Sequence, residues 1–226
     1  MSMCTADRRM GRWMTGSLLL TLILTVSGCG FGHNSAPAYL LDLGTPPNTA
    51  PATDQTSVSA STPSVGTSHR EPVAIRFSGA QMLASTNVIW RVGDSANPQS
   101  YATYRWAAPP LQLVQQRIVE MLSTNRAVVQ DGADPHAPLL QVFLTRFEQV
   151  YAPDGKSSTG QVSMQVVLVR NHRVEGSVLL SRSAPAPTQD AQGGAQALRT
   201  ATDAATDELI RWLEQQLRQT TTEPGS

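Results

Sequence analysis

Cys29 is the residue whose chemistry the sequence indicates most clearly, because of what precedes it. The small residues Ser27 and Gly28 stand directly before its thiol, an uncharged apolar run occupies positions 18–26, and three arginines lie within positions 8–12. This order is that of a bacterial lipoprotein signal peptide: the thiol accepts a diacylglycerol, and a peptidase that accepts small residues cuts before the cysteine. We therefore predict lipidation of Cys29 and cleavage between Gly28 and Cys29.

The alternative is an uncleaved anchor helix with an incidental cysteine. The apolar run is shorter than the roughly 20 residues that a membrane-spanning helix takes, and the small residues stand where a cleavage site belongs. Both points favour the lipoprotein interpretation. Cys4 is lost with the signal peptide, so residues 29–226 keep one cysteine, which is lipidated, and we expect no disulfide.

Composition narrows the partners. The chain has 17 basic and 17 acidic residues, and the signal peptide holds more basic than acidic ones, so the mature chain is slightly acidic. A nucleic-acid partner would require a basic face, and we expect none. Attachment must then come from the acyl chains. Gly30 and Phe31 follow Cys29, where an Asp would favour retention in the inner membrane, so we expect an outer-membrane lipoprotein that faces the periplasm.

The polar residues form no familiar catalytic arrangement. Ser177 follows Gly176 inside an expected strand, without the turn of a nucleophile elbow. Asp203, Asp207 and Glu208 are expected on the solvated face of a helix. No pair of histidines has the spacing of a metal site; they are His33, His69, His136 and His172. We predict a protein that is not an enzyme and that holds no metal and no cofactor.

Aromatic residues gather in one expected hairpin, at Trp90, Tyr101, Tyr104 and Trp106. One interpretation is packing within the sheet, with an aromatic pair at its edge. The other is a contact surface, because Tyr and Trp are favoured at interfaces. On the second interpretation, Trp90, Tyr104 and Trp106 are the predicted contacts with a partner.

The elements that must position these residues lie within positions 72–219. Alternating apolar residues predict a strand at 73–77, a hairpin over 88–106 and a three-stranded meander over 139–183. Helical spacing predicts one helix that opens at Pro109-Pro110 and ends near 125, and another over 190–219. The fold class is therefore α+β: a single domain with an antiparallel β-sheet and two α-helices packed on one face.

The flanking segments have different compositions. Residues 29–71 hold the lipidated N-terminus, a brief strand over 39–43 and, from Gly44 to Glu71, a run of Pro, Thr, Ser and Ala. We interpret that run as a flexible linker between anchor and domain, with an extended reach of roughly 90 Å at about 3.3 Å per residue. Residues 220–226 are expected to form a disordered tail.

With these elements in order, residues 39–217 resemble the ABC-type transport auxiliary lipoprotein family. The resemblance lies in the order and spacing of short motifs rather than in any one of them. It departs from the family at 44–71, where relatives have a shorter loop. The motifs are the box at Cys29, Tyr39-Leu40-Leu41, Pro72-Val73-Ala74-Ile75, Tyr104-Arg105-Trp106, Pro109-Pro110-Leu111, Leu140-Gln141-Val142, Phe147-Glu148 and an Ala-rich terminal helix.

The resemblance implies a function. Such lipoproteins accompany transporters made of an ABC ATPase, a permease and an MCE-domain protein, which move phospholipids or other hydrophobic molecules between the inner and outer membranes. On this basis we expect a non-catalytic transport subunit. Two alternatives remain open, a structural or assembly lipoprotein of an outer-membrane complex and a lipid-binding carrier domain.

Overall fold

The structure, a computed structural model, describes residues 38–46 and 70–222. These residues belong to one compact unit, residues 36–226. The other unit, residues 1–35, lies outside the described residues. The expected signal peptide, the cleavage site at Gly28 and the lipidated Cys29 therefore lie outside them as well.

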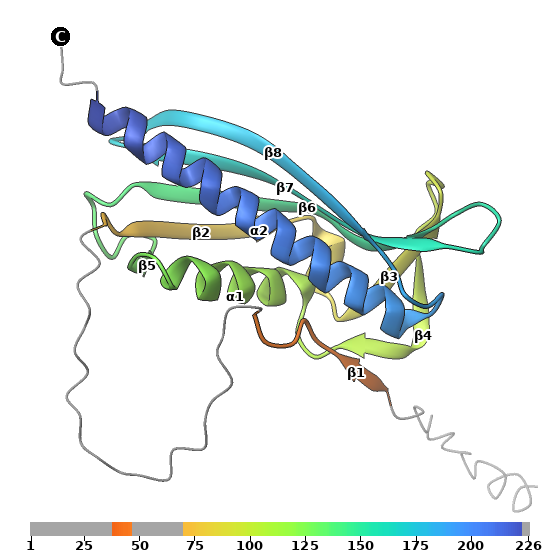
Figure 1. Cartoon of the computed structure of the whole chain (residues 1–226). Helices are drawn as coiled ribbons and strands as arrows, with labels where there is room; N and C mark the ends of the chain where they lie inside the picture. Colours follow the sequence, from red (N-terminus) through yellow and green to blue (C-terminus); the bar gives the residue numbers. More distant parts are fainter. Residues whose placement is uncertain (1–37, 47–69, 223–226) are drawn as a thin grey trace, which may run out of the picture. The chain divides into compact units, whose positions relative to one another are not determined.

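Alternating apolar residues form the three long strands of the sheet. Strands β6 (Leu139–Tyr151), β7 (Ser158–Arg170) and β8 (Arg173–Pro185) pair in order as an antiparallel meander (Figure 1). Every second residue of β7 is buried from Ser158 to Leu168, because successive residues of a strand face opposite sides of the sheet. The predicted meander is confirmed.

The sheet forks along the other edge of β6. The first half of β6 pairs with β2 (Val73–Gly79), and β2 pairs on its other side with β5 (Val128–Gln130). Its last three residues pair with β3 (Asn87–Val92). On its other side β3 pairs with β4 (Gln99–Trp106), and β4 pairs in turn with β1 (Tyr39–Leu41). The short 3-10 helix η1 (Gln81–Ala84) separates β2 from β3.

The sheet is mixed, which corrects the expectation of an antiparallel sheet. Four pairs are parallel, namely β1–β4, β2–β5, β2–β6 and β3–β6. Other elements intervene along the chain between the members of each pair, and such crossovers return the chain in the same direction. Alternation in a sequence reveals the two faces of a strand but not the direction of its neighbours. The α+β class is confirmed.

Both helices cover the same face of the sheet (Figure 1). Helix α1 (Pro110–Ser123) has a proline in its first turn and buries Val114, Ile118 and Leu122, as predicted. Helix α2 (Ala191–Thr222) packs on β7 and β8. It ends at Thr222, so the predicted boundary between helix and tail falls too early, and residues 223–226 lie outside the described residues. The buried stripe of α2 contains Leu198, Ala201, Ala205, Leu209 and Leu213.

Helix α2 approaches β7 closely at Gly160. A Cβ atom at this glycine would lie 2.4 Å from the backbone nitrogen of Leu198 and 2.6 Å from the carbonyl carbon of Ala197. No side chain fits at that distance, because both obstacles are backbone atoms. The absence of a side chain at Gly160 therefore sets how closely the helix lies on the sheet, near the end that carries the aromatic residues.

Candidate contact surface

Five aromatic rings form a continuous row at one end of the sheet. They come from β1, β4, β3 and β6, and neighbouring ring centroids are 5.4, 6.0, 6.2 and 5.6 Å apart along the row. These separations are those of attractive aromatic pairs. We call this set the aromatic row; in order it is Tyr39, Tyr104, Tyr101, Trp90 and Tyr151.

A bulge in β6 directs part of the row toward the helix face of the sheet. The pairing of β6 with β7 shifts register between Leu144 and Arg146. Before the shift, even-numbered residues such as Leu144 are buried against the helices; after it, Phe147 and Gln149 are buried there. The bulge therefore brings Gln149 and Tyr151 to the same face as Trp90, which pairs with Gln149 across β3 and β6.

A buried amide holds the centre of the row. The Tyr101 hydroxyl donates to Gln149 Oε1 at 2.8 Å, and Gln149 Nε2 donates to Ser158 Oγ at 2.8 Å. The Tyr101 and Tyr151 oxygens are 2.6 Å apart, so Tyr151 is the donor in that pair, since a hydroxyl has one hydrogen. Burial, and then the hydrogen bond with Tyr151, raise the pKa of Tyr101 well above its usual value. Tyr101 therefore stays neutral and keeps its proton for Gln149.

The first turn of α2 reaches this amide because it contains Gly194. A Cβ atom there would lie 2.1 Å from Gln149 Oε1. Asp190 stands directly before the helix, and its carboxylate accepts from the Gly193 backbone nitrogen at 2.7 Å. That hydrogen bond is the main reason why the pKa of Asp190 is lowered, and a second hydrogen bond, from the Thr188 hydroxyl, lowers it further. The start of α2 and the aromatic row thus meet at one end of the molecule.

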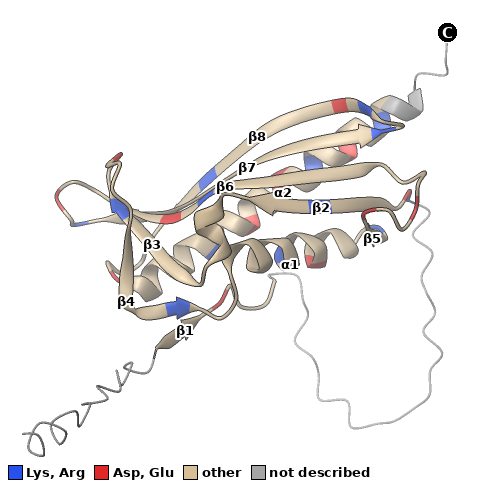
Figure 2. Cartoon of the chain, turned by 180° about the vertical axis from the view of Figure 1, so that it is seen from behind, with Lys and Arg blue, Asp and Glu red and all other residues tan. Residues whose placement is uncertain are grey.

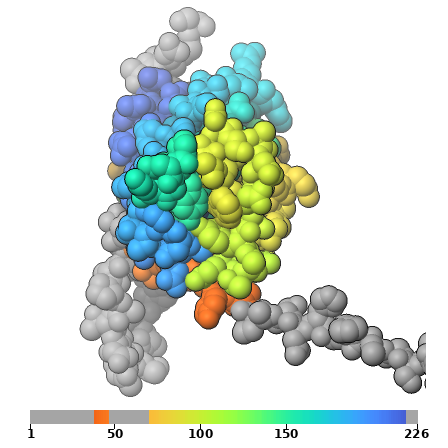
Figure 3. Space-filling view, turned by 90° about the vertical axis from the view of Figure 1, so that its right-hand side faces the viewer, coloured from red at the N-terminus to blue at the C-terminus, as the bar shows by residue number. Residues whose placement is uncertain are grey.

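An apolar pocket opens beside the row. Its volume is about 290 Å³, and it is lined by Trp90, Val92, Tyr101, Tyr151, Ala152, Pro153 and Gly155. At the opposite end of the row, Tyr39 is 65% exposed and its neighbour Leu40 is 68% exposed. Figure 3 faces this end and shows β1 in orange, β3 and β4 in yellow to yellow-green, the turn between β6 and β7 in green and the start of α2 in blue. We call this surface, from Tyr39 to the pocket, the aromatic end.

The three predicted contact residues have different environments. Trp90 lines the pocket, and Tyr104 is half-buried between Tyr39 and Tyr101. The prediction that Trp106 contacts a partner is wrong. This residue is 1% exposed and packs against Phe147 in the core, with ring centroids 5.3 Å apart. It is the last residue of β4, and its buried indole has no surface to offer a partner.

Sequence reasoning missed Tyr151 and the exposed pair Tyr39 and Leu40 as members of this surface. Tyr39 and Tyr151 are more than 100 positions apart, and only the pairing of β1 with β4 and of β3 with β6 joins them. The available signal was the resemblance, which includes Tyr39-Leu40-Leu41 as a motif. It did not indicate which partner strand this motif would join.

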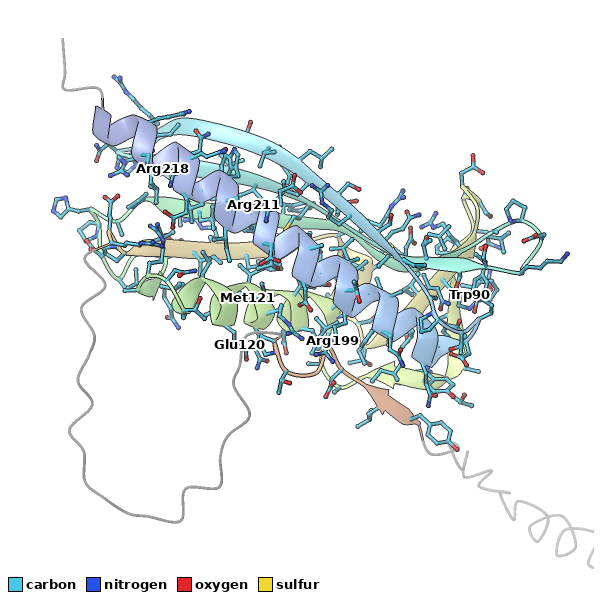
Figure 4. All side chains as sticks on the ribbon, viewed as in Figure 1. Trp90, Glu120, Met121, Arg199, Arg211 and Arg218 are labelled. Atoms are coloured by element: carbon cyan, nitrogen blue, oxygen red, sulfur yellow. The ribbon has the colours of Figure 1, made fainter. Side chains whose placement is uncertain are left out.

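Two arginines hold the segment that follows β1. Arg117, on α1, is 2% exposed, and its Nη2 donates to the carbonyl oxygens of Leu43 and Gly44, the latter at 2.7 Å. Arg199, on α2 and labelled in Figure 4, donates to the Thr45 carbonyl oxygen at 2.8 Å. We call Arg117 and Arg199 the arginine clamp. The clamp binds backbone atoms, so the segment is held whatever its side chains are.

Asp203 balances the charge of the clamp. Its Oδ1 lies 3.5 Å from Arg117 Nε, and burial raises the pKa of Asp203 while the two arginines oppose that rise. This partly corrects the expectation of a solvated acidic face on α2. Asp207 is exposed, whereas Glu208 pairs with Arg182.

The position of β1 corrects the interpretation of residues 44–71 as a linker between anchor and domain. Strands β1 and β2 both belong to the sheet, so this segment connects two elements of one fold. Its described ends are held: Arg117 and Arg199 bind Gly44 and Thr45, and Glu71 forms ion pairs with Arg170. Residues 47–69 lie outside the described residues. The segment before the sheet is therefore the stretch that ends at residue 38.

Charges are distributed without a dominant sign. Figure 2 shows Lys and Arg interspersed with Asp and Glu along the strands and helices.

Within residues 38–46 and 70–222, no cluster of His, Cys, Asp and Glu has the geometry to hold a metal ion. His136 and His172 are exposed in loops, and His33 and His69 lie outside the described ranges. No helix in the described part of the chain is long and apolar enough to cross a membrane.

Comparison with known proteins identifies the fold. No family model and no curated protein matches the sequence. Protein XCC0632 from Xanthomonas campestris, of family DUF330, aligns with a TM-score of 0.60 at 20% identity, over 68% of this chain and 88% of its own. A crystal structure of an uncharacterised protein aligns with a TM-score of 0.55 at 16% identity, over 63% of this chain and 92% of its own. What is shared is the fold.

A third structure is more distant. Lipoprotein GNA1162 from Neisseria meningitidis aligns with a TM-score of 0.31 at 9% identity, over 66% of this chain and 99% of its own. This score is too low to indicate a common fold. The function must therefore be argued from the residues of this chain.

Proposed function

We propose that this chain is a non-catalytic, lipid-anchored periplasmic subunit of an ABC/MCE-type transport system. The system would move phospholipids or other hydrophobic molecules between the inner and outer membranes. Its partners would be an MCE-domain protein with its ABC permease and ATPase. Anchoring through Cys29 would attach the domain to the outer membrane, on the periplasmic side.

The observation that carries the proposal is the position of β1. Nine residues, 30–38, separate Cys29 from Tyr39, and β1 is paired with β4 and followed by the arginine clamp. An acylated Cys29 would therefore hold the domain by its aromatic end, at most about 30 Å from the lipid at about 3.3 Å per residue. A subunit held so close to one membrane is suited to receive or dock a partner that comes from the other.

The transport role itself rests on the resemblance. The motifs that carry it fall on elements that the fold uses: Tyr39-Leu40-Leu41 is β1, Tyr104-Arg105-Trp106 ends β4, and Pro110 opens α1. A solvent-exposed surface that combines Tyr, Trp, Leu and Pro side chains is also typical of a binding surface. Both points favour a docking subunit over a free-standing enzyme.

The carrier alternative is less well supported. A lipid carrier needs an apolar cavity large enough for acyl chains, and ligand pockets usually enclose about 300–1,000 Å³. Between the sheet and the two helices the space is filled by buried side chains, among them Trp106, Phe147 and Leu209. A carrier function would have to use surface pockets, such as the one of about 290 Å³ beside Trp90 or the one of about 680 Å³ between α1 and α2, whose lining includes the polar side chains of Glu120, Asn125 and Asp207.

Affinity capture from membranes tests the proposal. The tagged full-length lipoprotein would be purified in mild detergent and its partners identified by mass spectrometry, with Cys29→Ala as the non-lipidated control. We expect an MCE-domain protein with its permease and ATPase, in reduced amount with the control. Reproducible recovery of a β-barrel or of cell-wall machinery without these components would instead favour the assembly lipoprotein. Lipid that copurifies with the chain alone would favour the carrier.

A further inference from the structure

Exposed apolar side chains lie at both ends of the aromatic row, one of which is the point where the chain enters the fold. Tyr39 and Leu40 are 65% and 68% exposed in β1, and Val92 is 42% exposed at the rim of the pocket beside Trp90. The row of rings links Tyr39 to Trp90 at the pocket; Leu40 follows Tyr39 at the sheet edge in β1, and Val92 lines the same pocket as Trp90. Leaving such side chains in water is unfavourable by roughly 25 cal/mol for each Å² of apolar area, so a surface of this kind marks an interaction site.

The length of chain before β1 identifies what can cover this surface. With Cys29 acylated, residues 30–38 allow Tyr39 to lie at most about 30 Å from the bilayer surface. Helix α2 alone, with 32 residues, is about 48 Å long at 1.5 Å per residue. The domain is thus longer than its tether, and the aromatic end is the part that the tether keeps nearest to the lipid.

The chemistry of the aromatic end fits the boundary between headgroups and acyl chains. Tyr and Trp combine an apolar ring with a polar group and concentrate at membrane interfaces. Leu40, Val92 and Pro153 supply purely apolar contacts beside them. Asp154 and Lys156, in the turn between β6 and β7, are exposed and would lie at the level of the headgroups.

We infer that the aromatic end rests on the bilayer to which Cys29 is anchored, with Tyr39, Leu40 and Trp90 in the interfacial layer. This inference rests on the lipid anchor of the proposed function and adds an orientation to it. The opposite end, which contains the C-terminal part of α2, then points away from the membrane (Figure 4). Acyl chains provide attachment, and the aromatic end provides a second, weaker contact that limits the tilt of the domain.

Tryptophan fluorescence tests the orientation. The full-length lipoprotein, matured and acylated, would be reconstituted into phosphatidylcholine vesicles whose acyl chains are brominated near the headgroup. Bromine quenches only tryptophans close to the lipid. We expect emission to fall relative to unbrominated vesicles, and Trp90→Phe to remove more than half of that fall. The matched control is Trp212→Phe, because Trp212 packs beside Gly176 on the distal half of α2; it should leave the fall unchanged.

A second pair of variants tests the surface without changing a tryptophan. Leu40 and Leu179 are 68% and 69% exposed, but Leu179 lies on β8 opposite Gln165 of β7 and far from the aromatic row in the sheet order. Leu40→Asp should reduce quenching of Trp90 by more than half, and Leu179→Asp should not change it. Equal effects of the two substitutions would overturn the inference.

The outcomes separate the inference from the anchor. If the wild-type chain does not float with vesicles, the lipid anchor fails and the proposed function fails with it. If it floats but Trp90 is not quenched by brominated lipid, the anchor stands and the orientation is wrong. If Trp90 becomes shielded only when a partner protein is added, the aromatic end is a protein-docking surface and the inference is overturned.

Discussion

The two ends of the sheet differ in the kind of side-chain contact that holds their strands and loops together. At the aromatic end, rings from four strands pack on one another and on a single buried amide. At the opposite end, arginines and glutamates form ion pairs that join β7, α2 and the segment before β2. We call this second set the ionic end; it consists of Arg70, Glu71, Arg126, Arg170 and Glu214. Figure 4 labels Trp90 near one end of the molecule and Arg218 near the other.

This difference shows what each end is suited to meet. Arg170 binds both carboxylate oxygens of Glu71, at 2.6 and 2.9 Å, and this hydrogen bonding raises the pKa of Arg170. Such directional, charge-assisted contacts pair these charges within the fold and are compatible with water at their rim. The rings of the aromatic end cover one another only partly, so apolar surface stays exposed to solvent. One sheet thus has an end whose charges are paired within the fold and an end that leaves apolar side chains exposed.

Replacement of the buried arginine of the clamp should have the largest effect. Arg117→Leu removes the donor to the Leu43 and Gly44 carbonyls and leaves the half-buried Asp203 without its main partner. We expect a loss of about 3–5 kcal/mol in the free energy of unfolding, as for breaking a buried ion pair. Urea denaturation measures it. Arg199→Leu is the control and should cost less, because Arg199 is only partly buried and binds the Thr45 carbonyl; losses of equal size would argue against a special role of Arg117.

Removal of the central carboxylate should weaken the ionic end. Glu214→Ala deprives the buried Arg126 and the exposed Arg70 of their partner. We expect a loss of about 2 kcal/mol, below the range for fully buried pairs because the Glu214 side chain is 22% exposed. Thermal unfolding measures it. Glu120→Ala, on the exposed side of α1, should change stability by no more than about 0.5 kcal/mol. The prediction would be contradicted if Glu120→Ala were as destabilising as Glu214→Ala.

Removal of one hydroxyl should weaken the centre of the aromatic row and alter its pH dependence. Tyr101→Phe leaves Gln149 Oε1 without its donor, so we expect a loss of about 1–2 kcal/mol. Because the pKa of Tyr101 is raised in the folded state, its contribution is complete below the ordinary tyrosine pKa of about 10 and is lost progressively as the pH rises above it. Wild-type stability should therefore fall more steeply between pH 9 and pH 11, roughly the range that brackets that value, than that of the variant. Identical slopes in urea denaturation would argue against this role, and Tyr104→Phe serves as the control.

The sequence predicted the elements better than their arrangement. Alternation and helical spacing placed the meander, the hairpin and both helices correctly, because these signals are local. The fork of the sheet and its parallel pairs depend on contacts between distant segments. The bulge before Arg146 is an example: one unpaired residue reverses which side chains of β6 face the helices, and nothing in the alternation of Leu140 and Val142 announces it.

The candidate site was predicted only in part, for the same reason. Trp90 and Tyr104 belong to the aromatic end, whereas Trp106, equally aromatic in sequence, is in the core. Composition cannot separate these cases, because burial is decided by which element passes over a strand. The arginine clamp could not be predicted from the sequence either. Arg117 binds backbone carbonyl oxygens, which every residue has, so no residue type marks the acceptor.

The smallest expected effect is also the one on which the comparison of surfaces depends. Leu40→Asp and Leu179→Asp replace side chains of nearly equal exposure, so each should change the free energy of unfolding by no more than about 0.5 kcal/mol without lipid. Leu40 lies opposite Arg105 in the register of β1 and β4, so an aspartate there meets no like charge. Denaturation in lipid-free detergent solution measures both variants. If Leu40→Asp alone were strongly destabilising, a lost membrane contact would reflect a displaced β1, whereas equal stabilities would assign it to the exposed leucine itself.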